Sequence, residues 1–211
     1  MSRRNRFLIF DFDGTLADTF DLFLKIFDEA AILYGFRPFD RKKMEYLRTI
    51  DARSILRHHR VPLWKVPAIT HTTRKLMERY IHGVHLFPEI DLAISQLHDS
   101  GAKLALLTSN SRSNVLHVFG RELAARFDYL ECGSSIFGKP SRLKRLLARS
   151  GFSADDVVFI GDEIRDAHAA RRAGISFGAV SWGYGAVSSL VRAGASESFA
   201  EPGELMAKLM P

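Results

Sequence analysis

The sequence predicts an α/β fold, a parallel sheet flanked by helices, with a small helical module inserted after the first strand. Short apolar runs typical of buried strands alternate with segments of helical periodicity. Residues 17–85 break this alternation, because helix-like segments follow one another there without a convincing strand. The length of 211 residues suits one full domain plus a smaller appendage.

The expected strands are apolar runs that give way to polar or small residues. They cover residues 7–12, 103–108, 157–160, 176–181 and the shorter 129–132. Helical periodicity in the same part of the chain covers residues 89–100, 112–125, 141–150 and 166–173. We expect these helices to cover the faces of the sheet.

The inserted module should consist of helices alone, at residues 21–34, 41–46, 52–58 and 65–81. We therefore divide the chain into an α/β core, residues 1–16 plus 86–211, and a helical cap, residues 17–85. Because the cap follows the first strand directly, both of its connections lie at the carboxyl end of that strand. Ligands bind at this end of open α/β sheets, so the cap is expected to act as a lid.

Composition narrows the classes of partner. A net charge of +6 permits attraction to nucleic acid, anionic membranes or phosphorylated metabolites. The basic residues are dispersed without an aromatic-interleaved RNA signature, and no apolar stretch approaches about 18–20 residues, so neither nucleic acid nor membrane is expected as a partner. Cys132 is the only cysteine, which excludes an intrachain disulfide and favours a cytoplasmic location. Monomer and homodimer both remain open.

Two acidic residues stand where the first expected strand stops, in the run Asp-Phe-Asp-Gly-Thr at residues 11–15. Side chains two apart on an extended backbone point the same way, so Asp11 and Asp13 can project together. The two carboxylates repel each other unless a cation or a shared proton offsets their negative charge. Acidic pairs beside a glycine such as Gly14 are also common at turns, so a structural role remains open.

A second acidic cluster follows the apolar run 157–160, with Asp162 and Asp166 four residues apart. On a helical first turn such residues share a face, so both can converge on one ion. Capping of a helix N-terminus remains an alternative for Asp166. Carboxylates with a hydroxyl and a lysine suit a magnesium-phosphate site better than a transition-metal site, and no Cys/His cluster competes.

Four segments together resemble the ordered motifs of the haloacid dehalogenase (HAD) superfamily, in its phosphoglycolate phosphatase-like branch. They are residues 10–18, 104–110, 138–140 and 160–166. The resemblance implies a doubly wound, Rossmann-like parallel sheet with a small inserted α-helical cap. It also implies a Mg²⁺-dependent phosphatase. Its partner would be a small phosphorylated metabolite, a phosphate monoester that the enzyme hydrolyses.

The same resemblance implies roles for single residues. Asp11 would attack phosphorus and form an aspartyl-phosphate, with Asp13 as acid and base. Thr108 would donate hydrogen bonds to the phosphoryl oxygens, and Lys139 would balance their charge. Magnesium would be held by Asp11, the backbone carbonyl of Asp13 and Asp162, with Asp166 as a ligand or as the residue that orients one.

Further substrate contacts are expected from Ser109 and Asn110, as alternatives to the neighbouring threonine, and from Arg48 in a loop-like break of the cap. Glu163 departs from the commoner pattern, because many relatives carry a small or hydroxyl residue there. Two alternatives remain open: a phosphomutase, in which a second substrate hydroxyl replaces water, and a binding module without turnover. The intact carboxylates disfavour the binding module.

Overall fold

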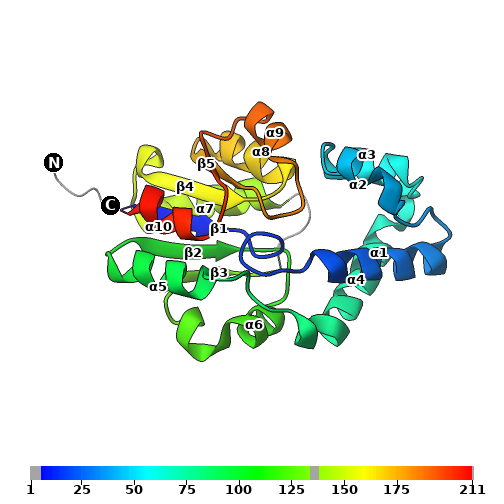
Figure 1. Cartoon of the computed structure of the whole chain (residues 1–211), viewed down its shortest axis with the longest axis horizontal. Helices are drawn as coiled ribbons and strands as arrows, with labels where there is room; N and C mark the ends of the chain where they lie inside the picture. The colour runs from blue at the N-terminus through cyan, green and yellow to red at the C-terminus, as the bar shows by residue number, and fades with distance from the viewer. Residues whose placement is uncertain (1–5, 134–137, 211) are drawn as a thin grey trace.

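The computed structural model describes residues 6–133 and 138–210 and has a six-stranded parallel sheet at its centre (Figure 1). The strand order is β3-β2-β1-β4-β5-β6, so the chain winds outward from β1 first on one side and then on the other. This is the doubly wound sheet that the resemblance implied. The strands are β1 (Phe7–Phe10), β2 (Lys103–Leu107), β3 (Tyr129–Glu131), β4 (Val157–Gly161), β5 (Ser176–Val180) and β6 (Glu197–Phe199).

All five expected strands are present, with ends that differ by one or two residues. The largest difference is in β1, which ends at Phe10 and leaves Asp11 and Phe12 beyond the strand. The edge strand β6 was not predicted, because three residues with only Phe199 buried carry no recognisable apolar run.

Both faces of the sheet are buried, as alternate side chains of β1 demonstrate. Leu8 and Phe10 belong to one hydrophobic core, whereas Phe7 and Ile9 belong to the core on the opposite face. Three helices cover the first face: α5 (Ile90–Asp99), α6 (Arg112–Ala124) and α10 (Gly203–Leu209). The other face is covered by α7 (Lys139–Ser150), α8 (Ile164–Ala173) and α9 (Val187–Arg192).

The sequence patterns predicted four of these six helices. Helix α7 begins at Lys139 rather than Ser141, because Pro140 lacks an N–H but fits the first helical turn, where none is needed. The short helices α9 and α10 were not predicted. In the described part of the chain, no helix is long and apolar enough to cross a membrane.

The segment between β1 and α5 forms a separate helical group beside the sheet (Figure 1). It contains four α-helices, α1 (Phe20–Tyr34), α2 (Met44–Leu47), α3 (Ala52–His58) and α4 (Val66–Tyr80), and three 3₁₀ turns, η1 (Arg41–Lys43), η2 (Leu63–Lys65) and η3 (Ile81–Gly83). We call this group the cap.

The two chain connections of the cap lie side by side at the carboxyl end of β1. Ala17 pairs with Leu86, and the backbone N–H of Asp18 donates to the carbonyl of His85 at 2.9 Å. The cap is therefore attached beside the end of the sheet at which we expected ligands to bind. The exact domain boundaries stay a prediction.

Candidate active site

Three polar residues come directly after three neighbouring strands. Asp11 follows β1, Thr108 follows β2 and Asp162 follows β4. Since β1 lies between β2 and β4 in a parallel sheet, Asp11 occupies the centre of this edge. The order of the strands thus brings together residues that are far apart in the sequence.

A buried group of carboxylates forms the centre of the site. Asp11 is 2% exposed and Asp162 and Asp166 are fully buried, and one oxygen from each lies within 4.8 Å of the others. The structure brings these carboxylates together, but the helical geometry expected for Asp162 and Asp166 was wrong. Asp162 lies before α8, which begins at Ile164, so the two residues do not meet as neighbours on a helical turn.

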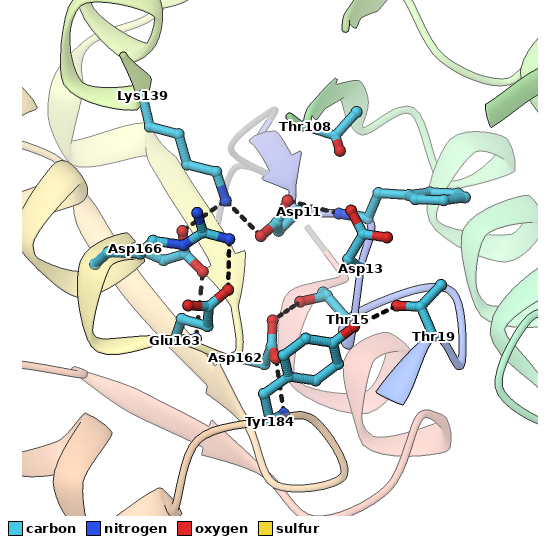
Figure 2. Close-up of polar contacts among 12 residues, drawn as sticks. Asp11, Asp13, Thr15, Thr19, Thr108, Lys139, Asp162, Glu163, Asp166 and Tyr184 are labelled. Carbon is cyan, nitrogen blue, oxygen red and sulfur yellow. Dashed lines mark hydrogen bonds and ion pairs between the residues drawn. The ribbon is translucent and has the colours of Figure 1, made fainter. Parts of the chain in front are cut away.

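Lys139 reaches into this group from the first turn of α7. Its ammonium donates to Asp11 Oδ2 and, at 2.7 Å, to Asp166 Oδ1 (Figure 2). Burial opposes the charge on Lys139, but the two carboxylates outweigh it and raise the pKa of Lys139. Lys139 therefore remains an ammonium group at neutral pH.

One ammonium does not balance three buried carboxylates. Burial raises the pKa of Asp11 to about 7, against the opposing charge of Lys139, and burial raises the pKa of Asp162 well above its usual value. A second positive charge would favour the ionised forms. Carboxylate oxygens are the ligands that hard cations such as Mg²⁺ prefer, so this donor set fits a divalent ion.

Asp162 is held by two hydrogen bonds. Thr15 Oγ1 donates to Oδ1 at 2.9 Å, and the backbone N–H of Tyr184 donates to Oδ2 at 2.8 Å (Figure 2). The backbone packs so closely that a Cβ atom on Gly14 would lie 2.3 Å from Asp162 Oδ2, and one on Gly183 would lie 2.2 Å from Asp162 Cβ. The contact with Tyr184 was not predicted; the only signal was a pair of glycines flanking an aromatic residue after a strand.

Asp13 has different partners from Asp11. Asn110 Nδ2 donates to Asp13 Oδ1 at 3.1 Å, and burial raises the pKa of Asp13 despite this hydrogen bond. The backbone N–H of Asn110 donates to Thr108 Oγ1 at 2.9 Å, and Figure 2 shows the Thr108 hydroxyl pointing toward the carboxyl groups of Asp11 and Asp13. A carboxyl group with a raised pKa can donate a proton near neutral pH, as a general acid must.

The extra carboxylate, Glu163, forms an ion pair with Arg165 on the first turn of α8. The backbone N–H of Glu163 donates to Asp166 Oδ2 at 3.2 Å, so Asp166 caps the start of α8 and also belongs to the carboxylate group. The capping role expected as an alternative for Asp166 is present, and its role toward a metal ion stays a prediction. The contact with Arg165 was not predicted, because a single arginine in a helical segment carries no distinctive pattern.

Arg48 connects the cap to the core. Its Nη2 and Nε donate to the carbonyls of Gly183 and Tyr184 at 2.9 and 3.1 Å, and its own carbonyl accepts from Ala186 N at 2.8 Å. These contacts tie the loop after α2 to the turn that holds Asp162. Recognition of the leaving group by Arg48 stays a prediction.

A cavity of about 490 Å³ lies between the cap and the carboxylate site. At its core end it is lined by Asp13, Ser109 and Asn110, which places the expected substrate contacts of Ser109 and Asn110 on its wall. Arg48 also lines it, on the cap side. The arrangement can hold a phosphorylated compound whose organic part extends into the cap.

Comparisons with known proteins agree on one family. Residues 8–180 match the profile of the family described as haloacid dehalogenase-like hydrolase. The chain is 33% identical over 187 residues to a phosphoglycolate phosphatase of Synechococcus elongatus, covering 88% of each chain.

Solved structures share the fold. A haloacid dehalogenase-like hydrolase from Streptococcus pneumoniae has a TM-score of 0.79 at 22% identity, covering 96% of this chain and 97% of the other. A structure from Thermotoga maritima assigned as a β-phosphoglucomutase has a TM-score of 0.66 at 22% identity, covering 97% and 98%. At these identities the likeness concerns the fold alone.

Proposed function

Because the chain belongs to the haloacid dehalogenase-like hydrolase family, we propose that it is a Mg²⁺-dependent phosphatase that hydrolyses a small organic phosphate monoester through an aspartyl-phosphate. The observation that carries the proposal is the convergence of Asp11, Asp162 and Asp166 with Lys139 at the carboxyl ends of the central strands. Phosphoryl transfer depends mainly on such positioning and charge stabilisation.

The reaction divides into two displacements at phosphorus. A carboxylate oxygen of Asp11 attacks phosphorus while Asp13 gives its proton to the departing alcohol oxygen. Asp13, now ionised, takes a proton from water, whose oxygen attacks the aspartyl-phosphate and releases phosphate and free Asp11. The raised pKa of Asp13 supports the first of these proton transfers. Thr108 and Lys139 would bind the phosphoryl oxygens, and Ser109 and Asn110 lie beside them.

Magnesium would be held by Asp11, the backbone carbonyl of Asp13 and Asp162, with Asp166 as a further ligand or as the residue that orients Lys139. When bound, the ion supplies charge neutralisation, which lets an anionic nucleophile and an anionic phosphoryl group come together. The three buried carboxylates, two of them paired with the ammonium of Lys139, support this assignment.

Hydrolysis of p-nitrophenyl phosphate tests the nucleophile. Asp11→Asn keeps the shape of the side chain but removes the attacking carboxylate, so turnover should be lost while the circular dichroism spectrum is unchanged. Asp155→Asn is the matched control, because Asp155 is exposed and lies outside the site. Wild-type activity in Asp11→Asn would refute the assignment.

Removal of divalent ions tests the metal. Excess chelator should abolish turnover, and added Mg²⁺ should restore it. Turnover that persists in chelator would rule out the metal role.

The substrate test also separates the alternatives that the sequence left open. Phosphoglycolate is the first compound to assay, since the Synechococcus elongatus relative acts on it by name. Incubation with sugar phosphates would reveal a phosphomutase through transfer to a second hydroxyl without release of phosphate. A cytoplasmic location, the absence of a nucleic-acid partner and a monomeric or homodimeric state stay predictions.

A further inference from the structure

We infer that the organic part of the substrate is predominantly apolar, because the cavity that receives it is lined by aliphatic and aromatic side chains of the cap. This inference rests on the proposed function and specifies its substrate class. It would distinguish this chain from an enzyme built for a small, doubly charged substrate such as phosphoglycolate.

The cavity reaches the catalytic site at Asp13, the proposed acid and base. Asp13 and Asn110 line the core end, and side chains of α1, α3 and α4 contribute much of the cap side. Its volume of about 490 Å³ falls within the range of roughly 300–1,000 Å³ typical of small-molecule sites. The two carbons of glycolate would leave most of this space unfilled, whereas an alkyl or aryl group would occupy it.

Large apolar side chains dominate the cap side of the wall. Phe23 and Phe27 from α1, Ile55 from α3, and Ile69 and Met77 from α4 all line the cavity. Each is only partly buried, so apolar surface faces the space rather than being fully packed. A bound apolar group would remove this surface from water, which favours binding in proportion to the area covered.

The charged cap residues on the wall balance one another. Arg48 and Arg74 are positive, and Asp51 and Glu78 are negative. Arg48 donates to the carbonyls of Gly183 and Tyr184, and Asp51 accepts from the backbone N–H of Ser54 at 2.7 Å. The described cap residues on this wall therefore provide no excess of positive charge for the carboxylate of a leaving group such as glycolate.

At the core end, Arg165 is also on the wall but forms an ion pair with Glu163, a second wall residue. Lys139, whose ammonium lies beside Asp11, is engaged with carboxylates and suits the phosphoryl group. The ammonium of Lys139 thus serves the phosphate end of the substrate, and the apolar cap side of the cavity serves the organic end.

Steady-state kinetics with methyl, butyl and hexyl phosphate, compared with phosphoglycolate, tests the inference. We expect kcat/KM to rise about three- to fourfold for each added methylene, from ~0.8 kcal/mol per buried group. Phosphoglycolate should be turned over less efficiently than butyl phosphate. A preference for phosphoglycolate, or no dependence on chain length, would overturn the inference while leaving the phosphatase proposal intact.

Met77→Gln tests the wall itself, because the two side chains have nearly the same shape and only the polarity changes. The ratio of kcat/KM for hexyl over methyl phosphate should fall at least threefold. The ratio is measured within one preparation, so partial loss of folded protein does not affect it. Met210→Gln, the same change at an exposed position at the end of α10, should leave the ratio unaltered. An unchanged ratio in Met77→Gln counts against the inference.

Absence of turnover with every phosphate monoester would defeat the proposed function. The affinities of hexylphosphonate and phosphonopropionate for the Mg²⁺-loaded protein would then show whether the cavity prefers an apolar or a charged organic group, without any need for turnover. Tighter binding of hexylphosphonate supports an apolar site, and tighter binding of phosphonopropionate overturns it.

Discussion

Replacing Gly14 with alanine perturbs the point at which the turn after Asp13 meets Asp162. Gly14 has a φ of 74°, in the left-handed region that favours glycine. A Cβ atom there would lie 2.3 Å from Asp162 Oδ2 and 2.7 Å from a ring carbon of Tyr184. Real Cβ atoms essentially never approach closer than 3.0 Å, so the Asp162 carboxylate must move by more than half an ångström.

The expected loss of stability in Gly14→Ala has two contributions. The left-handed conformation costs an alanine about 1–2 kcal/mol. Displacing Asp162 also endangers its hydrogen bonds from Thr15 and Tyr184, and a hydrogen bond to a charged group contributes about 1.5–3 kcal/mol. We therefore expect Gly14→Ala to lower the free energy of unfolding by about 2.5–5 kcal/mol if one of the two bonds is lost.

Gly174→Ala is the matched control. Gly174 has nearly the same φ, 76°, but a Cβ atom there meets nothing within 4 Å, and it lies at the far end of α8 from the site. This variant should lose only about 1–2 kcal/mol and keep its activity. Urea unfolding gives the free energies, and p-nitrophenyl phosphate gives kcat/KM, which should fall at least tenfold in Gly14→Ala alone. Equal losses of stability and activity in the two variants would show that the close approach of Gly14 to Asp162 is unimportant.

Substitutions at two further positions test the ion pairs of Lys139 and the N-cap of α3. Lys139→Met leaves Asp11 and Asp166 without their ammonium partner, so kcat/KM for p-nitrophenyl phosphate should fall at least a hundredfold; retention of wild-type kinetics would contradict this. Asp51→Ala removes the N-cap of α3, where Asp51 accepts from Ser54, and should cost about 1 kcal/mol in urea unfolding, whereas Asp51→Asn should cost less. The hydrogen bond to Ser54 lowers the pKa of Asp51, so its stabilisation is complete above the unfolded-state pKa and is lost as pH falls through the folded-state pKa. A penalty for Asp51→Ala that does not shrink in acid would contradict this sign.

The sequence allowed the central strands to be predicted because they are buried on both faces. β1, β2, β4 and β5 are continuous apolar runs, and a parallel order aligns their carboxyl ends. That order suffices to bring Asp11 and Asp162 together, whatever the details of the loops. The mistaken helical geometry for Asp162 and Asp166 left this part of the prediction intact, because strand order alone places Asp162 beside Asp11.

The contacts that orient the site were beyond the sequence because they depend on loop conformation. The Tyr184 backbone bonds Asp162 only because Gly183 and Gly14 allow two turns to approach closely. Arg48 reaches the same turn from the cap, and no local pattern indicates which carbonyls a loop arginine will meet. The apolar wall of the cavity was also hidden, since its residues have the same helical spacing as those of an ordinary packed face.

We propose that buried carboxylates from separate parts of the chain hold a cation so that Asp11 can accept phosphorus. Acid quenching of the working enzyme, followed by peptide mass spectrometry, tests it most directly. We expect a phosphoryl group on the peptide containing Asp11, dependent on Mg²⁺ and absent in Asp11→Asn. Labelling of a different residue, or rapid turnover with no labelled enzyme at any time, would contradict it.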